Sequence, residues 1–445
     1  MSDPTNAASP EPAPSEPSRL GGSSSGASRL EINPILPIFW VRPLPEIEAD
    51  MARLRAEEPV AWRTPPELPP ESMVQMGNGY WAVTRYADIL HVSKHPQLFS
   101  SAQGITMLDA PAEFNEFFGS MIALDDPRHA RLRKLVAAGF TPRMLKRVED
   151  AVQRVAADIV AEVAPRGEID FVVDVAAALP LRIICDMMGV PASQYHYVFG
   201  RTNVILGAGD PEYVAETENI IGAILQAGAD LAQLMHELAA TKAGGSGDDL
   251  TTQLLAAEVD GERLTAAELA SFFVLLVAAG NETTRNAIGW GLHYLTEKPA
   301  ARQLWQQDFE RVAPTAVDEI VRMASPVIYM RRTATQDTVL HGQPIAAGDK
   351  LCLFYWSANR DEDMFADPYR FDVRRSPNEH VGFGGPGPHF CLGAHLARRE
   401  ITVLFRELFR HLPDIEASGP PDPLRSSFIH GIKHLPARFT PVPVG

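Results

Sequence analysis

Cysteine is scarce in this chain: only Cys185, Cys352 and Cys391 occur among its 445 residues. So few cysteines exclude a disulfide scaffold and indicate a reducing compartment. Cys185 and Cys352 lie within apolar runs, where a buried free thiol is the ordinary explanation. Cys391 has glycine, proline and histidine neighbours instead, which a small core side chain would not require.

Long apolar runs are also absent. No stretch reaches the roughly twenty apolar residues that span a bilayer, and Met1–Pro10 has no basic flank ahead of an apolar stretch. We therefore expect a cytoplasmic protein with no stable membrane anchor. The formal net charge of -16 argues against nucleic acid as a partner, because phosphate binding requires a clustered cationic surface.

One segment departs from this acidic composition. It contains, with no Asp or Glu between them, Arg128, Arg131, Arg133, Lys134, Arg143, Lys146 and Arg147. Such a segment is either a solvated helix face or the docking surface of an acidic partner, and its composition leaves both interpretations open.

The N-terminal residues differ from the rest of the chain. Residues 1–30 are rich in Ser, Pro, Ala and Gly, which predicts a disordered tail because such a composition buries too little apolar surface to order itself. Residues 31–445 contain no second low-complexity linker and no repeat of fixed period, so we expect a single domain there.

Hydrophobic periodicity predicts a mainly helical body. Apolar spacing of three and four predicts helices over Arg143–Val163 and Ala267–Thr296. Tyr80–Thr84 alternates in a short aromatic and β-branched run, and Val327–Leu340 reads as strands joined by polar turns. The expected fold class is mainly α with small β-sheets.

The segment FGGPGPHFCLGAHLARREI, Phe383–Ile401, is a shaped loop that leads into a helix. We expect its glycines to let the backbone approach a flat ligand, and amide donors at the helix start to favour the thiolate of Cys391. Thiolate ligation of haem iron favours cleavage of a bound O–O bond. A surface turn with an incidental cysteine and a zinc site at His389, Cys391 and His395 are alternatives, but zinc requires closure by several ligands. The pattern favours haem iron held by Cys391.

Ser271–Trp290 is apolar for two helical turns and then abruptly polar from Asn281. An acid inside such a helix is costly unless it is used. Gly280 and the threonines weaken the local hydrogen bonding, and we expect a widened turn that leaves room for dioxygen. Glu282 would relay protons and the Thr283 hydroxyl would hold bound oxygen. The alternative is an amphipathic helix whose polar patch meets solvent.

Together these segments resemble the cytochrome P450 family. The resemblance implies a single triangular domain with the P450 fold and haem b (iron protoporphyrin IX) as cofactor. It makes Cys391 the axial iron ligand, and Glu282 and Thr283 the catalytic acid and alcohol. It also implies haem contacts for Phe383, Gly385 and Gly280. Phe383 lies eight residues before Cys391, whereas seven is usual in the family.

The resemblance assigns further residues. Glu319 and Arg322 match a structural pair that locks a meander behind the haem. The candidate ligands for the haem propionates, which require cationic or hydrogen-bonding partners, are His129, Arg133, Arg332 and His389. The same match implies that Arg398 and the basic segment lie on the thiolate side. A ferredoxin would dock there and deliver electrons from NAD(P)H through a ferredoxin reductase.

Within the family, stretches such as FGSMIALDDPRHARLR and SPVIYMRRTATQD resemble the mycobacterial-type methyl-branched lipid omega-hydroxylases. The resemblance implies oxidation of a terminal methyl on branched fatty acids, isoprenoids or a cholesterol-like side chain. That C–H bond is stronger than internal ones, so a narrow apolar funnel must present only the branched tip. Candidate wall residues, each of which core packing would also explain, are Ile105, Phe118, Met121, Leu206, Leu275, Ala278, Ala279, Ile328 and Phe428. Ala208 stands where we expect a bulkier aromatic side chain, which would widen the entrance.

Two other functions stay open from the sequence. One is a hydroxylase of smaller terpenoid or aromatic substrates in the same fold. The other is a haem sensor or carrier without turnover, against which the Glu282 and Thr283 pair argues. We expect the protein to be a monomer.

Overall fold

The computed structural model describes residues 30–68, 70, 72–215 and 218–442. The predicted disordered tail, residues 1–30, lies outside the described residues except for Leu30. The helices are α1 (Leu44–Glu57), α2 (Tyr86–Lys94), α3 (Ala112–Gly119), α4 (Arg128–Gly139), α5 (Pro142–Val163), α6 (Ala178–Met188), α7 (Tyr195–Gly207), α8 (Ile220–Lys242), α9 (Leu250–Ala256), α10 (Ala266–Glu297), α11 (Pro299–Gln307), α12 (Phe309–Ala324), α13 (Tyr355–Ala358) and α14 (Ala394–His411).

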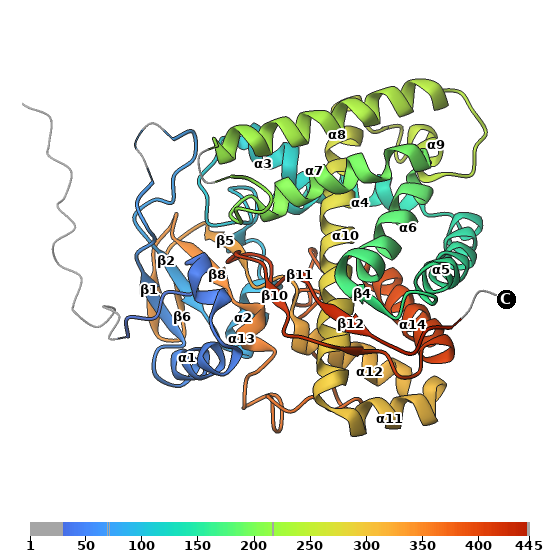
Figure 1. Cartoon of the computed structure of the whole chain (residues 1–445). Coiled ribbons are helices and arrows are strands. Elements are labelled where there is room, and N and C mark those ends of the chain that lie inside the picture. The colour runs from blue at the N-terminus through green and yellow to red at the C-terminus, as the bar shows by residue number, and fades with distance from the viewer. Residues whose placement is uncertain (1–29, 69, 71, 216–217, 443–445) are drawn as a thin grey trace, which may run out of the picture.

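The strands form small sheets rather than one large one. Their bounds are β1 (Val60–Arg63), β2 (Tyr80–Val83), β3 (Phe99–Ser100), β4 (Glu168–Asp170), β5 (Met330–Ala334), β6 (Thr338–Leu340), β7 (Gln343–Ile345), β8 (Lys350–Leu353), β9 (Glu416–Ala417), β10 (Asp422–Pro423), β11 (Ile432–His434) and β12 (Pro436–Arg438). The largest sheet has the order β1-β2-β8-β5-β3, in which only β2 and β8 run parallel. It lies at the left of Figure 1 beside α1, α2 and α13, and the longer helices make up the rest of the molecule.

The predicted elements are present. The helix expected over Arg143–Val163 is α5, and the helix expected over Ala267–Thr296 is α10. Tyr80–Thr84 contains β2, and Val327–Leu340 contains β5 and β6. The prediction of a mainly helical fold with small sheets is therefore confirmed.

Helix α10 crosses the middle of the molecule (Figure 1) and packs against α3, α6, α7, α8 and α12. It begins with a capping box in which Thr265 accepts from the backbone of Glu268 and the Glu268 side chain accepts from the backbone of Thr265. Among the described residues it is the one helix long and apolar enough to cross a membrane, and 56% of its most apolar window is buried inside the protein. The buried core helix of a soluble protein also meets these criteria of length and hydropathy.

Candidate active site

One stripe of α10 has side chains with accessible surface, although the rest of the helix is largely buried. Leu275, Ala279 and Thr283 follow one another at intervals of four residues, and each keeps accessible surface. The Thr283 hydroxyl donates to the carbonyl of Ala279 at 2.7 Å. The stripe therefore presents two apolar side chains and one hydroxyl to a space beside the helix.

Gly280 does not widen the helix as the sequence suggested. The helix is continuous through this residue, so the expected widened turn is not present. A Cβ atom at Gly280 would lie 2.7 Å from Cδ1 of Ile184 on α6. The missing Cβ atom lets Ile184 of α6 pack closely on α10, and contact of Gly280 with haem stays a prediction.

The loop that carries Cys391 closes on itself, because the backbone N–H of Cys391 donates to the carbonyl of Phe383 at 3.0 Å. Cys391 keeps part of its surface exposed, whereas Cys185 and Cys352 are buried. Burial raises the pKa of the Cys391 thiol, although the backbone amide of Gly393 and the charge of Arg133 oppose it. The amides of Gly393 and Ala394 at the start of α14 thus favour the thiolate as expected, but burial outweighs their effect. Coordination to a metal cation would supply the missing driving force, because a coordinated thiol is deprotonated outright.

The glycines of this loop pack against protein. A Cβ atom at Gly385 would lie 2.6 Å from the Ser93 hydroxyl on α2, and one at Gly387 would lie 2.4 Å from the Ser93 carbonyl. Gly387 also has φ +151°, a conformation that other residues rarely adopt. These glycines therefore let the loop pack against α2, which fixes the loop in place, and the expected approach to a flat ligand stays a prediction.

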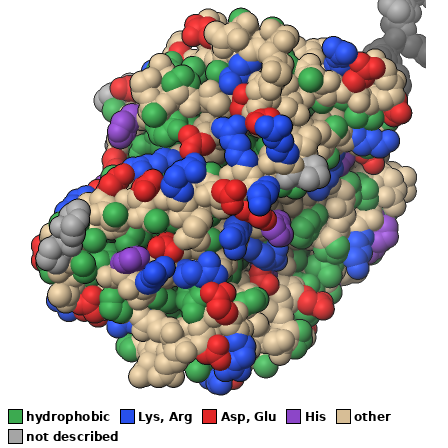
Figure 2. All heavy atoms as spheres, turned by 90° about the vertical axis from the view of Figure 1, so that its right-hand side faces the viewer, with side chains coloured by type: hydrophobic (Ala, Val, Ile, Leu, Met, Phe, Trp, Pro, Cys, Tyr) green, Lys and Arg blue, Asp and Glu red, His purple; other side chains and the backbone are tan. Residues whose placement is uncertain are grey.

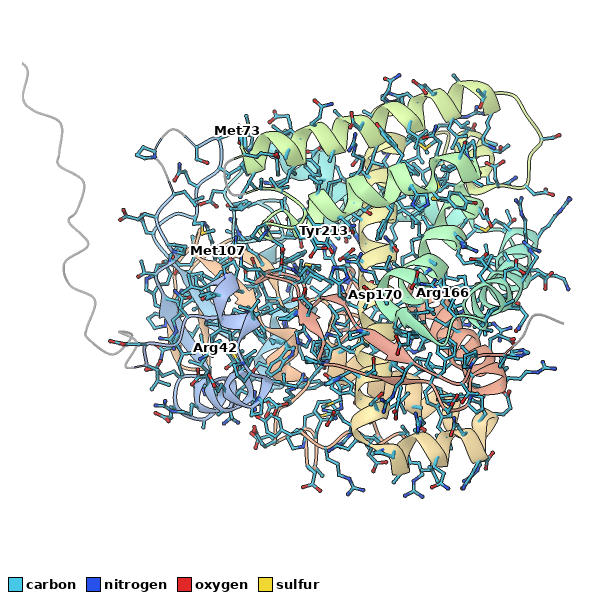
Figure 3. The ribbon with its side chains drawn as sticks, viewed as in Figure 1. Arg42, Met73, Met107, Arg166, Asp170 and Tyr213 are labelled. Atoms are coloured by element: carbon cyan, nitrogen blue, oxygen red, sulfur yellow. The ribbon has the colours of Figure 1, made fainter. Side chains whose placement is uncertain are left out.

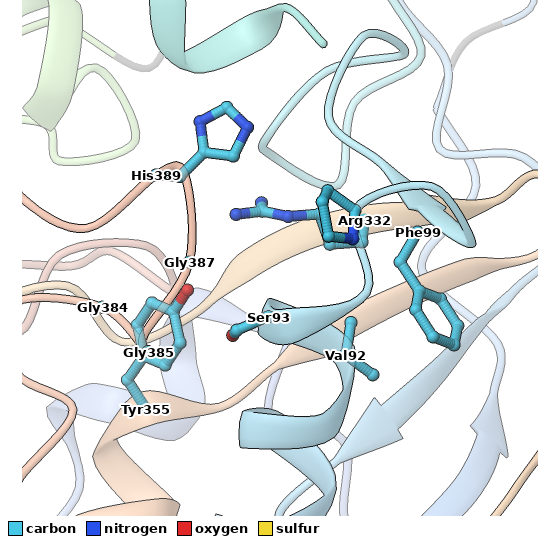
Figure 4. A pocket seen from close by; sticks show the side chains of 10 residues that line it. Val92, Ser93, Phe99, Arg332, Tyr355, Gly384, Gly385, Gly387 and His389 are labelled. Carbon is cyan, nitrogen blue, oxygen red and sulfur yellow. The ribbon is translucent and has the colours of Figure 1, made fainter. Parts of the chain in front are cut away.

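Cationic groups meet at the edge of the loop. The rings of His129 on α4 and His389 lie 4.4 Å apart, and the Ser101 hydroxyl lies 3.1 Å from Nε2 of His389. Burial, reinforced by the charges of Arg332, His129 and Arg133, lowers the pKa of His389 to about 3. Figure 4 shows the Arg332 guanidinium reaching from β5 into the space below the His389 ring. All four predicted propionate ligands are thus near one another, and Ser101 is an addition that sequence reasoning missed.

Two nitrogen atoms in this cluster have no partner. Nε2 of His129 and Nδ1 of His389 are buried and make no hydrogen bond within the described part of the chain. Buried polar atoms are rarely left unsatisfied. Together with the surrounding positive charge, they fit an anionic ligand such as a carboxylate. A cysteine for iron, an open apolar helix stripe and a cationic cluster for propionates are the features that a haem requires.

The acid on α10 has a partner that the sequence did not reveal. The carboxylate of Glu282 pairs with the guanidinium of Arg285, and the two side chains are only 1% and 2% exposed. Arg285 also donates to the side-chain oxygen of Asn203 on α7 at 3.0 Å. Burial raises the pKa of Glu282, and the charge of Arg285 opposes that effect. The signal in the sequence was the spacing of three between Glu282 and Arg285, which places both on one helix face.

Glu319 and Arg322 form an ion pair on α12 with two contacts of 2.8 Å, and both side chains are fully buried. Arg322 also donates to the carbonyls of Asn359 and Pro368, at 2.7 and 2.8 Å. Glu319 accepts in addition from Arg375. The pair thus joins α12 to the irregular segment 359–375, as expected for a structural lock.

The predicted wall residues divide into two groups. Ile328 is 0% exposed and Met121 is 3% exposed, and each belongs to a packed apolar cluster. These two are core residues with little or no surface for a ligand, so their assignment to the substrate wall was wrong. Ala278 is buried as well. The residues that keep accessible surface are Ile105, Phe118, Leu206, Leu275, Ala279 and Phe428. Ala208, which we expected to widen an entrance, is 5% exposed.

In the folded protein, acidic side chains neutralise part of the charge of the basic segment. Arg128 pairs with Glu116, Arg131 with Glu262 and Glu268, and Arg143 with Asp248. Figure 2 shows Lys and Arg mixed with Asp and Glu on the face that includes α5, rather than one uniform basic patch. The members of the segment with no ion pair in the described structure are Arg133, Lys134, Lys146 and Arg147.

Comparison with known proteins agrees with this geometry. A family model described as Cytochrome P450 matches residues 230–434. The chain is 50% identical to the methyl-branched lipid omega-hydroxylase of Mycobacterium tuberculosis over 90% of this chain and 93% of that protein. It is 38% identical to the steroid C26-monooxygenase of the same organism over 91% and 92% of the two chains. A Mycobacterium marinum cytochrome P450, CYP268A2 in complex with pseudoionone, superposes with TM-score 0.86 and 42% identity over 94% of this chain and 100% of that one.

The chain belongs to the cytochrome P450 family. It is a P450 monooxygenase, and membership of the family implies haem as its cofactor. It is similar both to a lipid omega-hydroxylase and to a steroid C26-monooxygenase.

Proposed function

We propose that this P450 hydroxylates the terminal methyl group of a methyl-branched lipid or of a steroid side chain. The observation that carries the proposal is the stripe on α10, where apolar Leu275 and Ala279 lead to the hydroxyl of Thr283. An alkyl chain lying along this stripe would meet apolar surface and then a single polar group. Such packing would hold the chain end near the reacting centre. The similarity to enzymes named for omega and C26 oxidation supports the same choice.

The haem and the residues of the site would each have a separate role. Bound haem would supply dioxygen activation and insertion of oxygen into the C–H bond. Cys391 would hold the iron, and His129, Arg133, Arg332 and His389 would bind the propionates. Thr283 would present its hydroxyl beside the space for haem, and Glu282 would supply protons if its carboxylate turned away from Arg285.

Product regiochemistry tests this function. A terminally methyl-branched fatty acid and cholest-4-en-3-one would be turned over with NADH, a ferredoxin reductase and a ferredoxin, and the alcohols identified by mass spectrometry. Terminal alcohols from either lipid are expected. Scattered internal alcohols, or no displacement of the haem-bound water by either lipid in a spectral titration, would contradict the proposal.

A smaller substrate is the second candidate. The Mycobacterium marinum relative was solved with pseudoionone, a short isoprenoid ketone. If this candidate is correct, pseudoionone would shift the haem spectrum at lower concentration than either lipid, and its alcohol would form faster.

We also infer that electrons arrive from NAD(P)H through a ferredoxin, and that residues 31–445 act as one cytoplasmic, monomeric domain. Lys134 and Lys146 are exposed members of the basic segment without an ion pair in the described structure. Replacing both with Glu is expected to slow reduction by a ferredoxin about tenfold at low salt, with less effect at high salt. The control is Lys298→Glu, which reverses one exposed charge in the connection from α10 to α11 and is compared with Lys134→Glu alone. Equal effects of the two changes would contradict docking at the basic segment.

A further inference from the structure

The connection between α7 and α8 is tied to the C-terminal strands by charge. Asp210 accepts from the backbone N–H of Arg425 at 2.9 Å and lies 3.3 Å from Nζ of Lys433. The same ammonium lies 3.0 Å from Glu212 and 3.4 Å from Asp422. Lys433 on β11 thus gathers two carboxylates of the connection and one of β10.

His434 makes a second set of contacts with carboxylates, next to those of Lys433. Its Nδ1 lies 2.5 Å from Asp170 on β4, and its Nε2 lies 3.0 Å from Glu212 on the connection. An ionised carboxylate only accepts hydrogen bonds, so both contacts are satisfied only when both ring nitrogens carry protons. The geometry therefore fits the imidazolium form of His434.

The same connection packs against the end of α7, near the buried ion pair of α10. A Cβ atom at Gly207 would lie 2.4 Å from the ring of Tyr213, so this ring rests against the end of α7. Burial raises the pKa of Tyr213 to about 12, and the charges of Arg285 and Glu282 on α10 also act on it. Figure 3 shows Tyr213 beside the C-terminal strands and Asp170 at β4. The connection therefore lies between the buried ion pair of α10 on one side and His434 on the other.

We propose that His434 is a proton-dependent latch that holds the α7–α8 connection against β4 and the C-terminal strands. This inference concerns how firmly the connection beside the site is held, and it goes beyond the proposed function. The charged groups that face the imidazole are Asp170 on β4, Glu212 on the connection, Asp422 on β10 and the neighbouring Lys433.

The direction of the pH effect follows from these neighbours. Burial alone would lower the pKa of His434, but hydrogen bonds to Asp170 and Glu212 outweigh burial and raise it above the ordinary value. A raised pKa means that the closed connection is favoured below this pKa, and that the contribution is lost as the pH rises through it. Lys433 keeps its charge over the same range, because its pKa is raised as well. The connection would thus loosen rather than detach.

Hydrogen–deuterium exchange of the haem-loaded enzyme tests the latch without any substrate. Uptake by peptides within residues 207–214 would be compared between the native protein and His434→Gln from pH 6 to 9, with EDTA present. Comparison at equal pH removes the intrinsic pH dependence of exchange. At pH 6 the variant is expected to exchange about two- to fivefold faster, because partly exposed ion pairs contribute modestly, and the difference should vanish near pH 9.

Two further variants make the result decisive. Glu212→Gln removes the other half of the contact and is expected to lose the same pH-dependent protection. His411→Gln removes a histidine that contacts Glu407 at 3.5 Å on α14, and should exchange like the native protein at every pH. Equal exchange of native protein and His434→Gln throughout, or a difference that does not change with pH, would overturn the latch.

Discussion

Arg285 and Glu282 form a buried ion pair one turn apart at the centre of the molecule, and Arg285 extends the pair to Asn203 on α7. Removing one member of a buried pair leaves an uncompensated charge. Arg285→Met is therefore expected to lower the free energy of unfolding by about 3 kcal/mol or more, measured by urea denaturation of the haem-loaded protein.

A double variant separates charge from packing. Glu282→Gln combined with Arg285→Met leaves no buried charge and should recover part of the lost stability. Arg53→Met breaks an exposed pair with Glu57 on α1 and should cost less than about 1 kcal/mol. If Arg285→Met lowered the free energy of unfolding no more than Arg53→Met, the buried pair would contribute no more to stability than an exposed pair.

Thr283 lies on the open stripe of α10, whereas the next residue, Thr284, is buried. Thr283→Ala removes the hydroxyl and is expected to reduce product formed per NADH by about tenfold, while NADH consumption continues and hydrogen peroxide accumulates. Product, NADH and peroxide would be measured in the same reactions. Thr284→Ala is the matched control, and a similar loss of product per NADH in this variant would contradict a specific role for Thr283.

Arg322 donates through its planar guanidinium to Glu319 and to two backbone carbonyls at once. A lysine cannot reproduce this fork. Arg322→Lys is therefore expected to destabilise the protein by about 3 kcal/mol or more in urea denaturation. Arg438→Lys changes an exposed pair with Glu416 and should have little effect. A stability loss from Arg322→Lys no larger than that from Arg438→Lys would refute the structural role of Arg322.

His430 is buried against Trp290, with ring centroids 4.5 Å apart and Nδ1 2.6 Å from the carbonyl of Ala324. Burial lowers the pKa of His430 to about 3. The unfolded chain binds this proton near the ordinary pKa, so stability falls as the pH drops below that value. From pH 7 to pH 5 this one histidine is expected to cost about 2 kcal/mol. Urea denaturation at both pH values would show a smaller acid loss in His430→Gln than in the native protein, and an equal loss would contradict the prediction.

Much of the fold could be read from local pattern. The apolar spacing in 267–296 and the capping box at its start specify a long helix wherever that segment folds, because both act within a few residues. The loop that ends in Cys391 was also visible, since its glycines and prolines depart so far from core composition. Local pattern did not show that the missing Cβ atoms of Gly280 and Gly385 also make room for Ile184 and for Ser93, because these neighbours come from other elements.

The sequence by itself determined the family, the cysteine that would bind iron, and the helices around it, because those features reside in short-range spacing and composition. Only the tertiary structure decided which charges are neutralised. Arg131 pairs with Glu262, and His434 pairs with Asp170 and Glu212, because segments far apart in the chain pack against each other. Pairing of this kind depends on where whole elements pack, and no local pattern encodes it.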